Sequence, residues 1–126
     1  MTFQYIHTDN APRAVGPYSQ AVKAGNLVFV SGQMPVDPAT GEIITSDAAA
    51  QAGQCLKNVM AILGEAGMNA GHIVRMTVYL KDMNEFAAVN EVYATFFDGS
   101  YPARVCVEVS RLPKDVGVEI DAIAYC

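Results

Sequence analysis

The sequence is short of charge and has no long apolar run. Charged residues make up 17% of the 126 residues, whereas roughly a quarter is typical of a soluble domain. This shortfall indicates that part of the surface is apolar and is covered by other copies of the chain. No apolar segment approaches the length needed to cross a membrane, so a membrane-spanning protein is not expected.

A basic patch is also missing. The formal net charge is −5, and no block of like charges occurs anywhere along the chain. Proteins that bind nucleic acids usually carry a cluster or stripe of lysine and arginine. The sequence therefore argues against a nucleic-acid-binding function.

Cysteine and histidine are few and scattered. Cys55, Cys106 and Cys126 are an odd number and have no metal-binding or redox spacing, while His7 and His72 are isolated from each other. We therefore expect no metal site and no required disulfide. The N-terminus has neither a basic head nor an apolar core, so we expect no signal peptide and a location in the cytoplasm.

The spacing of apolar residues predicts four strands and two helices. Ser46 or Asp47 can cap the first helix, Gly67 suits its C-terminal end, and Asp82 can cap the second helix. In chain order the predicted elements are a strand at 27–31, a helix from 46 or 47 to 67, a strand at 73–81, a helix at 82–97, and strands at 104–110 and 118–125.

Strands separated by helices of this length predict crossover connections, so at least part of the sheet should be parallel. We expect residues 1–126 to form one domain of the α+β class, with a single sheet and both helices on one face. The other face of the sheet should be too apolar to be left wholly to water, which marks an interface.

The last two predicted strands carry a group of residues suited to chemistry. Polar and reactive side chains alternate with valines in the first of them, at Arg104, Cys106 and Glu108. In the second, Glu119 and Asp121 lie opposite an apolar row. Two neighbouring strands would place the arginine, thiol and carboxylate together on the face away from the helices, where they can bind a small anion and transfer a proton. The alternative is that they are ordinary residues of a solvated face.

Two further positions have two interpretations each. Ser31 and Gly32 end a buried strand, where the absence of a side chain on glycine lets a ligand approach the backbone; the alternative is an ordinary turn. Asn90 interrupts the apolar stripe of the second helix. It is either a residue at the solvent edge, which we favour from the pattern, or a polar group directed at a site.

Several segments together resemble the signature of the Rid (YjgF) family, in particular its RidA branch of reactive-intermediate deaminases. They are residues 16–21 (GPYSQA), 31–33 (SGQ), 102–109 (PARVCVEV), 111–113 (RLP) and 118–120 (VEI). The resemblance covers essentially the whole chain. It implies a chorismate-mutase-like fold and a homotrimer whose sheets line a central barrel, with three equivalent clefts between subunits.

The resemblance also implies a reaction. Family members hydrolyse 2-imino acids or their enamine tautomers, such as 2-iminobutanoate and 2-iminopropanoate, to 2-oxo acids and ammonia. These imines are released by pyridoxal-phosphate enzymes, which implies a functional link to such enzymes. No cofactor and no metal are implied, because an imine is already electrophilic.

The family roles fall on particular residues of this chain. Arg104 matches the arginine that binds the substrate carboxylate, and Glu119 matches the acid that deprotonates the attacking water. The backbone of Cys106 matches the group that hydrogen-bonds the imine nitrogen. The family positions that line the cleft or bind the substrate are Tyr18, Ser31, Gly32 and Asn90.

Two other functions stay open at this point. A non-catalytic trimer that binds small carboxylates and regulates a partner would need Arg104 and would tolerate loss of Glu119. A ribonuclease or translation inhibitor, an activity attributed to some relatives of the family, is disfavoured by the acidic net charge. The turn at 98–100 is shorter than in many relatives, which leaves the substrate range open.

Overall fold

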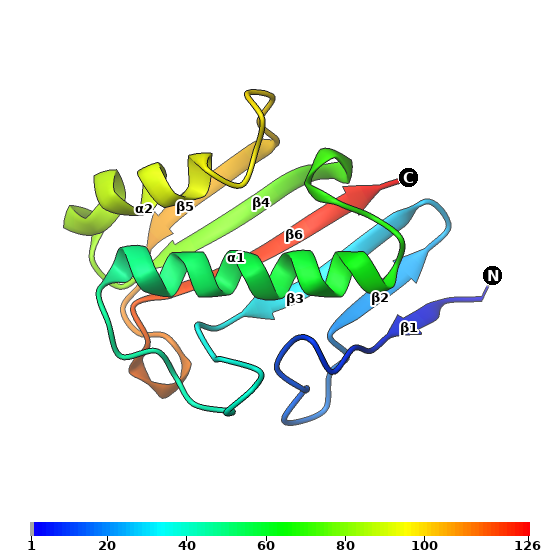
Figure 1. Ribbon diagram of the computed structural model, residues 1–126, viewed down its shortest axis with the longest axis horizontal. Helices are drawn as coiled ribbons and strands as arrows, with labels where there is room; N and C mark the ends of the chain where they lie inside the picture. Colours follow the sequence, from blue (N-terminus) through cyan, green and yellow to red (C-terminus); the bar gives the residue numbers. More distant parts are fainter. Residues whose placement is uncertain (1) are drawn as a thin grey trace.

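The computed structural model describes residues 2–126 and contains one mixed, six-stranded sheet with two helices on one face (Figure 1). The strand order is β1-β2-β3-β6-β4-β5. The elements are β1 (Gln4–Ile6), β2 (Ala21–Ala24), β3 (Leu27–Gln33), α1 (Ala48–Glu65), η1 (Ala70–His72), β4 (Ile73–Leu80), η2 (Met83–Glu85), α2 (Phe86–Ala94), β5 (Ala103–Glu108), η3 (Pro113–Asp115) and β6 (Val118–Tyr125). The predicted single sheet with both helices on one face is confirmed.

Pairing within the sheet is partly parallel, as predicted. β4 and β5, which α2 connects, pair in parallel, whereas β6 pairs antiparallel with both β3 and β4. The short strands β1 and β2 pair antiparallel and extend the sheet beyond β3. Neither was predicted, because three or four residues are too few to show an alternating pattern.

Helix α1 begins and ends where the sequence predicted. The Asp47 side chain accepts a hydrogen bond from the backbone N–H of Ala50 at 2.9 Å and so caps the first turn. Gly67 follows the helix with a φ of 73°, a left-handed conformation that glycine adopts without strain. Between these ends, Cys55, Leu56 and other apolar residues at helical spacing are buried against the sheet. Cys55 thus belongs to the core.

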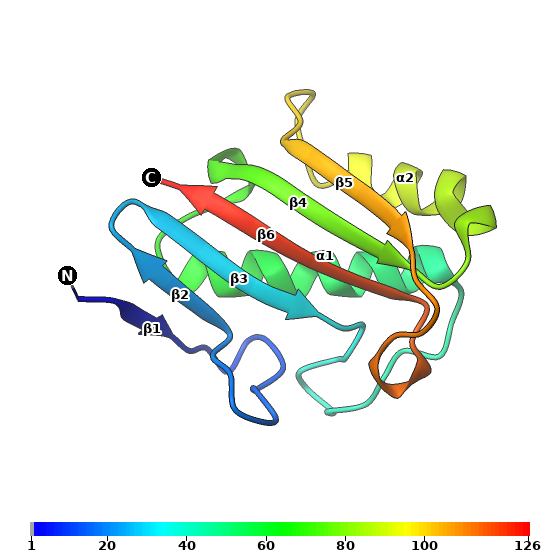
Figure 2. The same ribbon diagram turned by 180° about the vertical axis from the view of Figure 1, so that it is seen from behind.

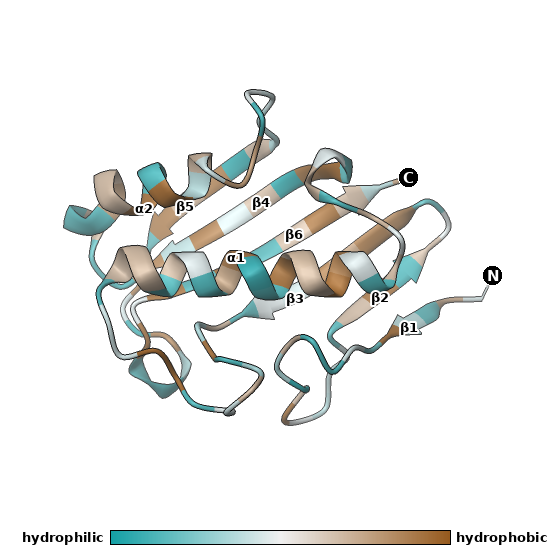
Figure 3. Ribbon diagram, in the orientation of Figure 1, coloured by the Kyte–Doolittle hydropathy of each residue, from teal (hydrophilic) through white to brown (hydrophobic). Residues whose placement is uncertain are grey.

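The core lies between the helices and one face of the sheet (Figure 3). Its strand residues alternate along each strand, as in Val28 and Val30 of β3 and Ile120 of β6. Helix α2 is shorter than α1 and contributes Val89 and Tyr93 to this core. No helix within residues 2–126 combines the length and hydrophobicity that a membrane crossing requires.

The other face of the sheet has no helix over it (Figure 2). Phe29 of β3 and Val105 and Val107 of β5 project from this open face, and between 37% and 43% of each remains exposed. Strands β6 and β4 lie between β3 and β5, and there Arg75 and Asp121 line a hollow together with Phe29. The uncovered face therefore carries the expected exposed apolar side chains, with charged groups between them.

Candidate active site

Arg104 projects from β5 toward the helices. In the parallel pair, Arg104 is opposite Met76 and Cys106 is opposite Val78, and both β4 residues are buried beneath the helices. Residues directly opposite each other in neighbouring strands have side chains on the same face of the sheet. Arg104 and Cys106 therefore lie on the helix-covered face, next to α2.

Three side chains of α2 hold the Arg104 guanidinium. Nη1 donates a hydrogen bond to Oδ1 of Asn90 at 2.6 Å, and the guanidinium carbon lies 5.5 Å from the ring centroid of Phe86 and 4.8 Å from that of Tyr93. Both aromatic contacts are cation–π interactions, which stabilise the charge without neutralising it. Within residues 2–126 Arg104 forms no ion pair. Its positive charge is therefore available to an anion.

A cleft of about 500 Å³ lies beside Arg104. It is lined by Asn90, Tyr93, Ala94, Tyr101, Pro102 and Arg104. Of the two interpretations of Asn90, the structure supports the one in which its side chain is directed at a site, because its amide oxygen orients the arginine.

Glu119 projects from the opposite face of the sheet. Its neighbours Val118 and Ile120 are fully buried on the helix side, so the alternation of β6 turns Glu119 to the open face. The carboxyl group is half-buried, and a Cβ atom added at Gly32 would overlap its Oε2. Desolvation, and secondarily the charge of Asp121, raise the pKa of Glu119 above its ordinary value. A raised pKa makes the carboxylate a stronger base and so favours proton transfer to it.

A second cleft, of about 390 Å³, contains Glu119 together with Tyr18 and Gly32. Ser31 is not among the residues that line this cleft. Its Oγ donates a hydrogen bond to the backbone oxygen of Ser19 at 2.6 Å. Ser31 thereby fixes the loop that carries Tyr18. The remaining residues that line this cleft are Pro12, Arg13, Val15, Gln33, Met34, Val36, Gly41, Pro113 and Lys114.

The prediction that Arg104, Cys106 and Glu119 share one face is wrong. Strand β4 lies between β5 and β6, and the side chains of Arg104 and Glu119 leave the sheet on opposite sides. The prediction assumed that the valines of β5 face the helices. They face the open side instead, because β5 is an edge strand and the aromatic residues of α2 cover Arg104.

Glu108 follows Arg104 and Cys106 onto the helix side, and its Oε1 accepts a hydrogen bond from the backbone N–H of Met83 at 2.8 Å. Glu108 thus ties β5 to η2 at the start of the segment that carries α2. Its position, too, corrects the expectation that it lies on the uncovered face with Glu119.

The thiol and the backbone of Cys106 differ in what they offer to a ligand. Burial raises the pKa of the Cys106 thiol, and the nearby Arg104 only partly offsets this, so the protonated form is favoured. The N–H of Val109 donates to the oxygen of Leu80 in β4. Because backbone N–H groups alternate in direction along a strand, the N–H of Cys106 points to the outer edge of β5, where it has no strand partner. Within residues 2–126 no group of three or more His, Cys, Asp and Glu side chains could hold a metal ion.

Comparison with known proteins gives a consistent result. The family described as Endoribonuclease L-PSP matches residues 8–126. A RutC family protein of Pyrococcus horikoshii is 59% identical over 122 residues, covering 97% of each chain. A 2-iminobutanoate/2-iminopropanoate deaminase of Escherichia coli K12 is 56% identical over 122 residues, covering 94% of each chain. The crystal structure of Escherichia coli TdcF with bound serine superposes with a TM-score of 0.94 at 52% identity and covers 98% of each chain.

Proposed function

This chain belongs to the Rid (YjgF) family, described also as Endoribonuclease L-PSP, and from that premise we propose that it hydrolyses 2-imino acids to 2-oxo acids and ammonia. The proposed substrates are 2-iminobutanoate and 2-iminopropanoate, which are named in the deaminase relative of Escherichia coli. The observation that carries the proposal is the pair of clefts, one with an un-neutralised arginine and the other with a half-buried carboxyl of raised pKa.

The two clefts act together only if the chain associates. The cleft of Arg104 and the cleft of Glu119 share no lining residue and open on opposite faces of the sheet. An active site that needs both groups is completed when the open face of one copy meets the helix-side edge of another. The exposed apolar side chains of the open face support this arrangement. We propose a homotrimer with three such sites, as the family resemblance implies, because a head-to-tail contact whose rotation closes gives a ring.

In this site Arg104 binds the substrate carboxylate. Its planar fork offers two parallel N–H groups to the two carboxylate oxygens, and Asn90 holds the fork in place from the other side. The outward N–H of Cys106 is placed on the same strand to hydrogen-bond the imine nitrogen. The substrate is then held with its C=N carbon exposed toward the neighbouring copy.

Glu119 of that copy supplies the proton transfers. The carboxylate takes a proton from water as the water oxygen bonds to the C=N carbon, the π electron pair moves to nitrogen, and Glu119 returns that proton to nitrogen to give the carbinolamine. The carboxylate then takes the hydroxyl proton as the carbonyl of the 2-oxo acid forms, the C–N bond breaks with its electron pair on nitrogen, and Glu119 gives this second proton to nitrogen, which leaves as ammonia. The step needs no cofactor, because imine and water balance to oxo acid and ammonia.

The chemistry of the proposed substrate indicates which kind of enzyme acts before this protein. Imines and enamines of this kind are products of pyridoxal-phosphate enzymes, so we propose that the protein works downstream of such an enzyme in the cytoplasm. Neither nucleic acid nor membrane is a proposed partner, and the net charge of −5 is unfavourable for binding nucleic acid.

A carboxylate-binding regulator is the second candidate. It is favoured by one observation, the bound serine in the related TdcF structure, because an amino acid has the carboxylate but no imine. Such a protein would need the cleft of Arg104 and would not need Glu119.

A coupled assay decides between the two. Threonine dehydratase acting on threonine generates 2-iminobutanoate, and the release of ammonia and 2-oxobutanoate is timed with and without this protein. We expect faster release, which depends on protein concentration, together with a trimer mass in light scattering. Unchanged release combined with binding of 2-oxobutanoate in calorimetry would instead favour the regulator.

A further inference from the structure

The cleft of Glu119 contains two positive charges that the proposed reaction does not use. Arg13 and Lys114 line it, and Glu119 is the one acidic residue among its lining residues. Within residues 2–126 neither Arg13 nor Lys114 forms an ion pair. The cleft therefore carries an excess of positive charge, although the whole chain has a net charge of −5.

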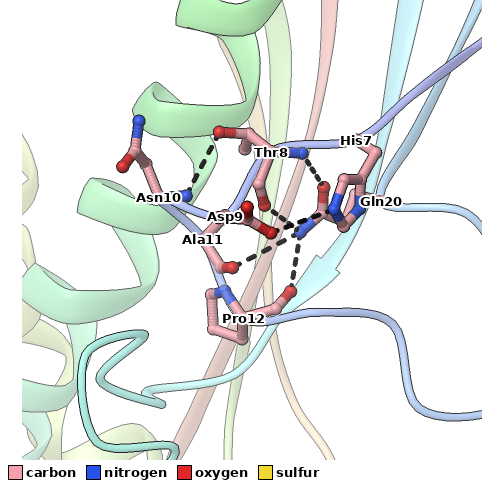
Figure 4. Close-up of polar contacts among 7 residues, drawn as sticks. All are labelled: His7, Thr8, Asp9, Asn10, Ala11, Pro12 and Gln20. Atoms are coloured by element: carbon pink, nitrogen blue, oxygen red, sulfur yellow. Dashed lines mark hydrogen bonds and ion pairs between the residues drawn. The ribbon is translucent and has the colours of Figure 1, made fainter.

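The loop that carries Arg13 is fixed by a buried glutamine. Gln20 is 2% exposed, and its Oε1 accepts a hydrogen bond from the N–H of Thr8 at 2.7 Å (Figure 4). Its Nε2 donates to the backbone oxygens of Thr8 at 3.0 Å and of Pro12 at 2.8 Å. Pro12 immediately precedes Arg13, so the Gln20 amide fixes the backbone at the point where the arginine leaves the loop.

A second contact fixes the loop after Arg13. The N–H of Val15 donates to the hydroxyl of Tyr18 at 3.3 Å, and Tyr18 itself lines the cleft. The backbone is thus held on both sides of Arg13, while the side chain stays exposed at the cleft. This arrangement places a cationic side chain at the cleft that also contains Glu119.

Lys114 is also held in place. Lys114 and Asp115 have φ values of 56° and 58°, a left-handed conformation that residues other than glycine rarely adopt. Arg111 stabilises this turn, because its Nε and Nη2 donate to the two carboxylate oxygens of Asp115 at 2.6 and 3.0 Å. The turn places Lys114 at the cleft, and the charges of Arg111 and Asp115 neutralise each other in an ion pair.

We propose that Arg13, assisted by Lys114, selects 2-imino acids whose side chain ends in a second anionic group. This inference rests on the proposed imine hydrolysis and specifies its substrate class. Arg104 of one copy takes the carboxylate next to the imine carbon, so a carboxylate at the far end of the substrate needs a separate cation on the Glu119 side. Arg13 offers a planar fork for that group, and Lys114 a point charge.

The test compares two imines across matched variants. 2-Iminoglutarate is generated from glutamate by an amino-acid oxidase, and 2-iminobutanoate is generated from threonine by threonine dehydratase. Arg13→Ala should lower kcat/KM for 2-iminoglutarate by about 10-fold to 100-fold, the loss expected for a charge-assisted hydrogen bond, and should leave 2-iminobutanoate within about 2-fold. Lys57→Ala removes an exposed positive charge on α1 and should change neither value.

Binding measurements distinguish a failure of this inference from a failure of the proposed function. Calorimetry with 2-oxoglutarate and 2-oxobutanoate should show weaker binding of only the former to Arg13→Ala. If 2-iminobutanoate is hydrolysed but Arg13→Ala leaves the preference between the two imines unchanged, the selection by Arg13 is wrong while the deaminase stands. If neither imine is hydrolysed, the deaminase is wrong, and the 2-oxoglutarate affinities of wild type and Arg13→Ala alone support or overturn the role of Arg13.

Discussion

The surroundings of Arg104 and of Glu119 have opposite effects on the charge of each group. Arg104 is surrounded by aromatic faces and an amide oxygen, which stabilise its charge. Glu119 lies half-buried beside Gly32, where desolvation, and secondarily the charge of Asp121, disfavour its charge and raise its pKa. In the proposed reaction the cleft of Arg104 binds an anion and the cleft of Glu119 exchanges a proton, so that binding and proton transfer are divided between two faces of one chain.

The largest expected effects come from removing either group. Arg104→Ala should abolish measurable binding of 2-oxobutanoate together with turnover, and Arg104→Lys should restore little, because lysine has the charge but not the fork. Glu119→Gln should leave 2-oxobutanoate binding nearly intact and reduce turnover by about 10²-fold to 10⁴-fold. The coupled assay and calorimetry measure the two effects.

These two results are controls for each other. Both variants should have the same oligomeric mass as the wild type, which separates a lost group from a lost assembly. Wild-type turnover by Arg104→Lys would overturn the binding role of Arg104, and normal turnover by Glu119→Gln would favour the regulator.

Mixing the inactive variants tests whether the two clefts meet between copies. If each site takes Arg104 from one copy and Glu119 from its neighbour, co-expressed Arg104→Ala and Glu119→Gln chains should recover about a quarter of wild-type activity. The two chains carry different tags, so hybrid trimers can be purified away from the pure ones, and these should show about a third of wild-type activity because one of their three sites is intact. A site contained within one chain would recover nothing, because no chain in the mixture carries both groups.

The sequence predicted the layers of this fold better than the faces of its strands. Asp47 and Gly67 were placed correctly as the ends of α1, since helix capping is a local signal. The alternation along β5 correctly separated Arg104 and Cys106 from the valines between them. It could not say which set faces the helices, because the aromatic residues of α2 cover Arg104 while the more apolar valines remain partly exposed on the open face.

The order of the strands in the sheet was the second feature that the sequence did not predict. β5 and β6 are consecutive in sequence, yet β4 lies between them, because the connection through η3 returns the chain to the other side of β4. The contact of Asn90 with Arg104 depends on this three-dimensional arrangement as well. The sequence signal that was available is the interruption of an apolar stripe by Asn90, one helical turn after Phe86.

A smaller effect is expected from Gly32→Ala. The added Cβ would overlap Oε2 of Glu119, which is the far end of a flexible side chain, so the carboxyl group can move aside. We expect turnover to fall by roughly 10-fold while Arg104-dependent binding of 2-oxobutanoate is retained, because a displaced base loses its alignment with water. Gly53→Ala on α1 is a matched control, since its nearest contact is an ordinary 3.5 Å to Val92. Equal turnover in the two variants would show that the position of the Glu119 carboxyl is not critical.

The smallest expected effect is a pH-dependent gain in stability in Glu119→Gln. Desolvation and the charge of Asp121 raise the folded-state pKa of Glu119, so folding favours the protonated carboxyl. The stability that this proton confers is fully present below the unfolded pKa of about 4.3 and is lost as the pH rises through the raised value. Glutamine cannot ionise, so Glu119→Gln should melt at a higher temperature than the wild type at pH 7, and the difference should disappear near pH 4. Glu42→Gln, at an exposed loop position, is the matched control for removing one negative charge. If thermal melts show the same difference for Glu119→Gln at both pH values, the Glu119 carboxyl is not strained by its burial, and the contrast between the two clefts would lie in their geometry alone.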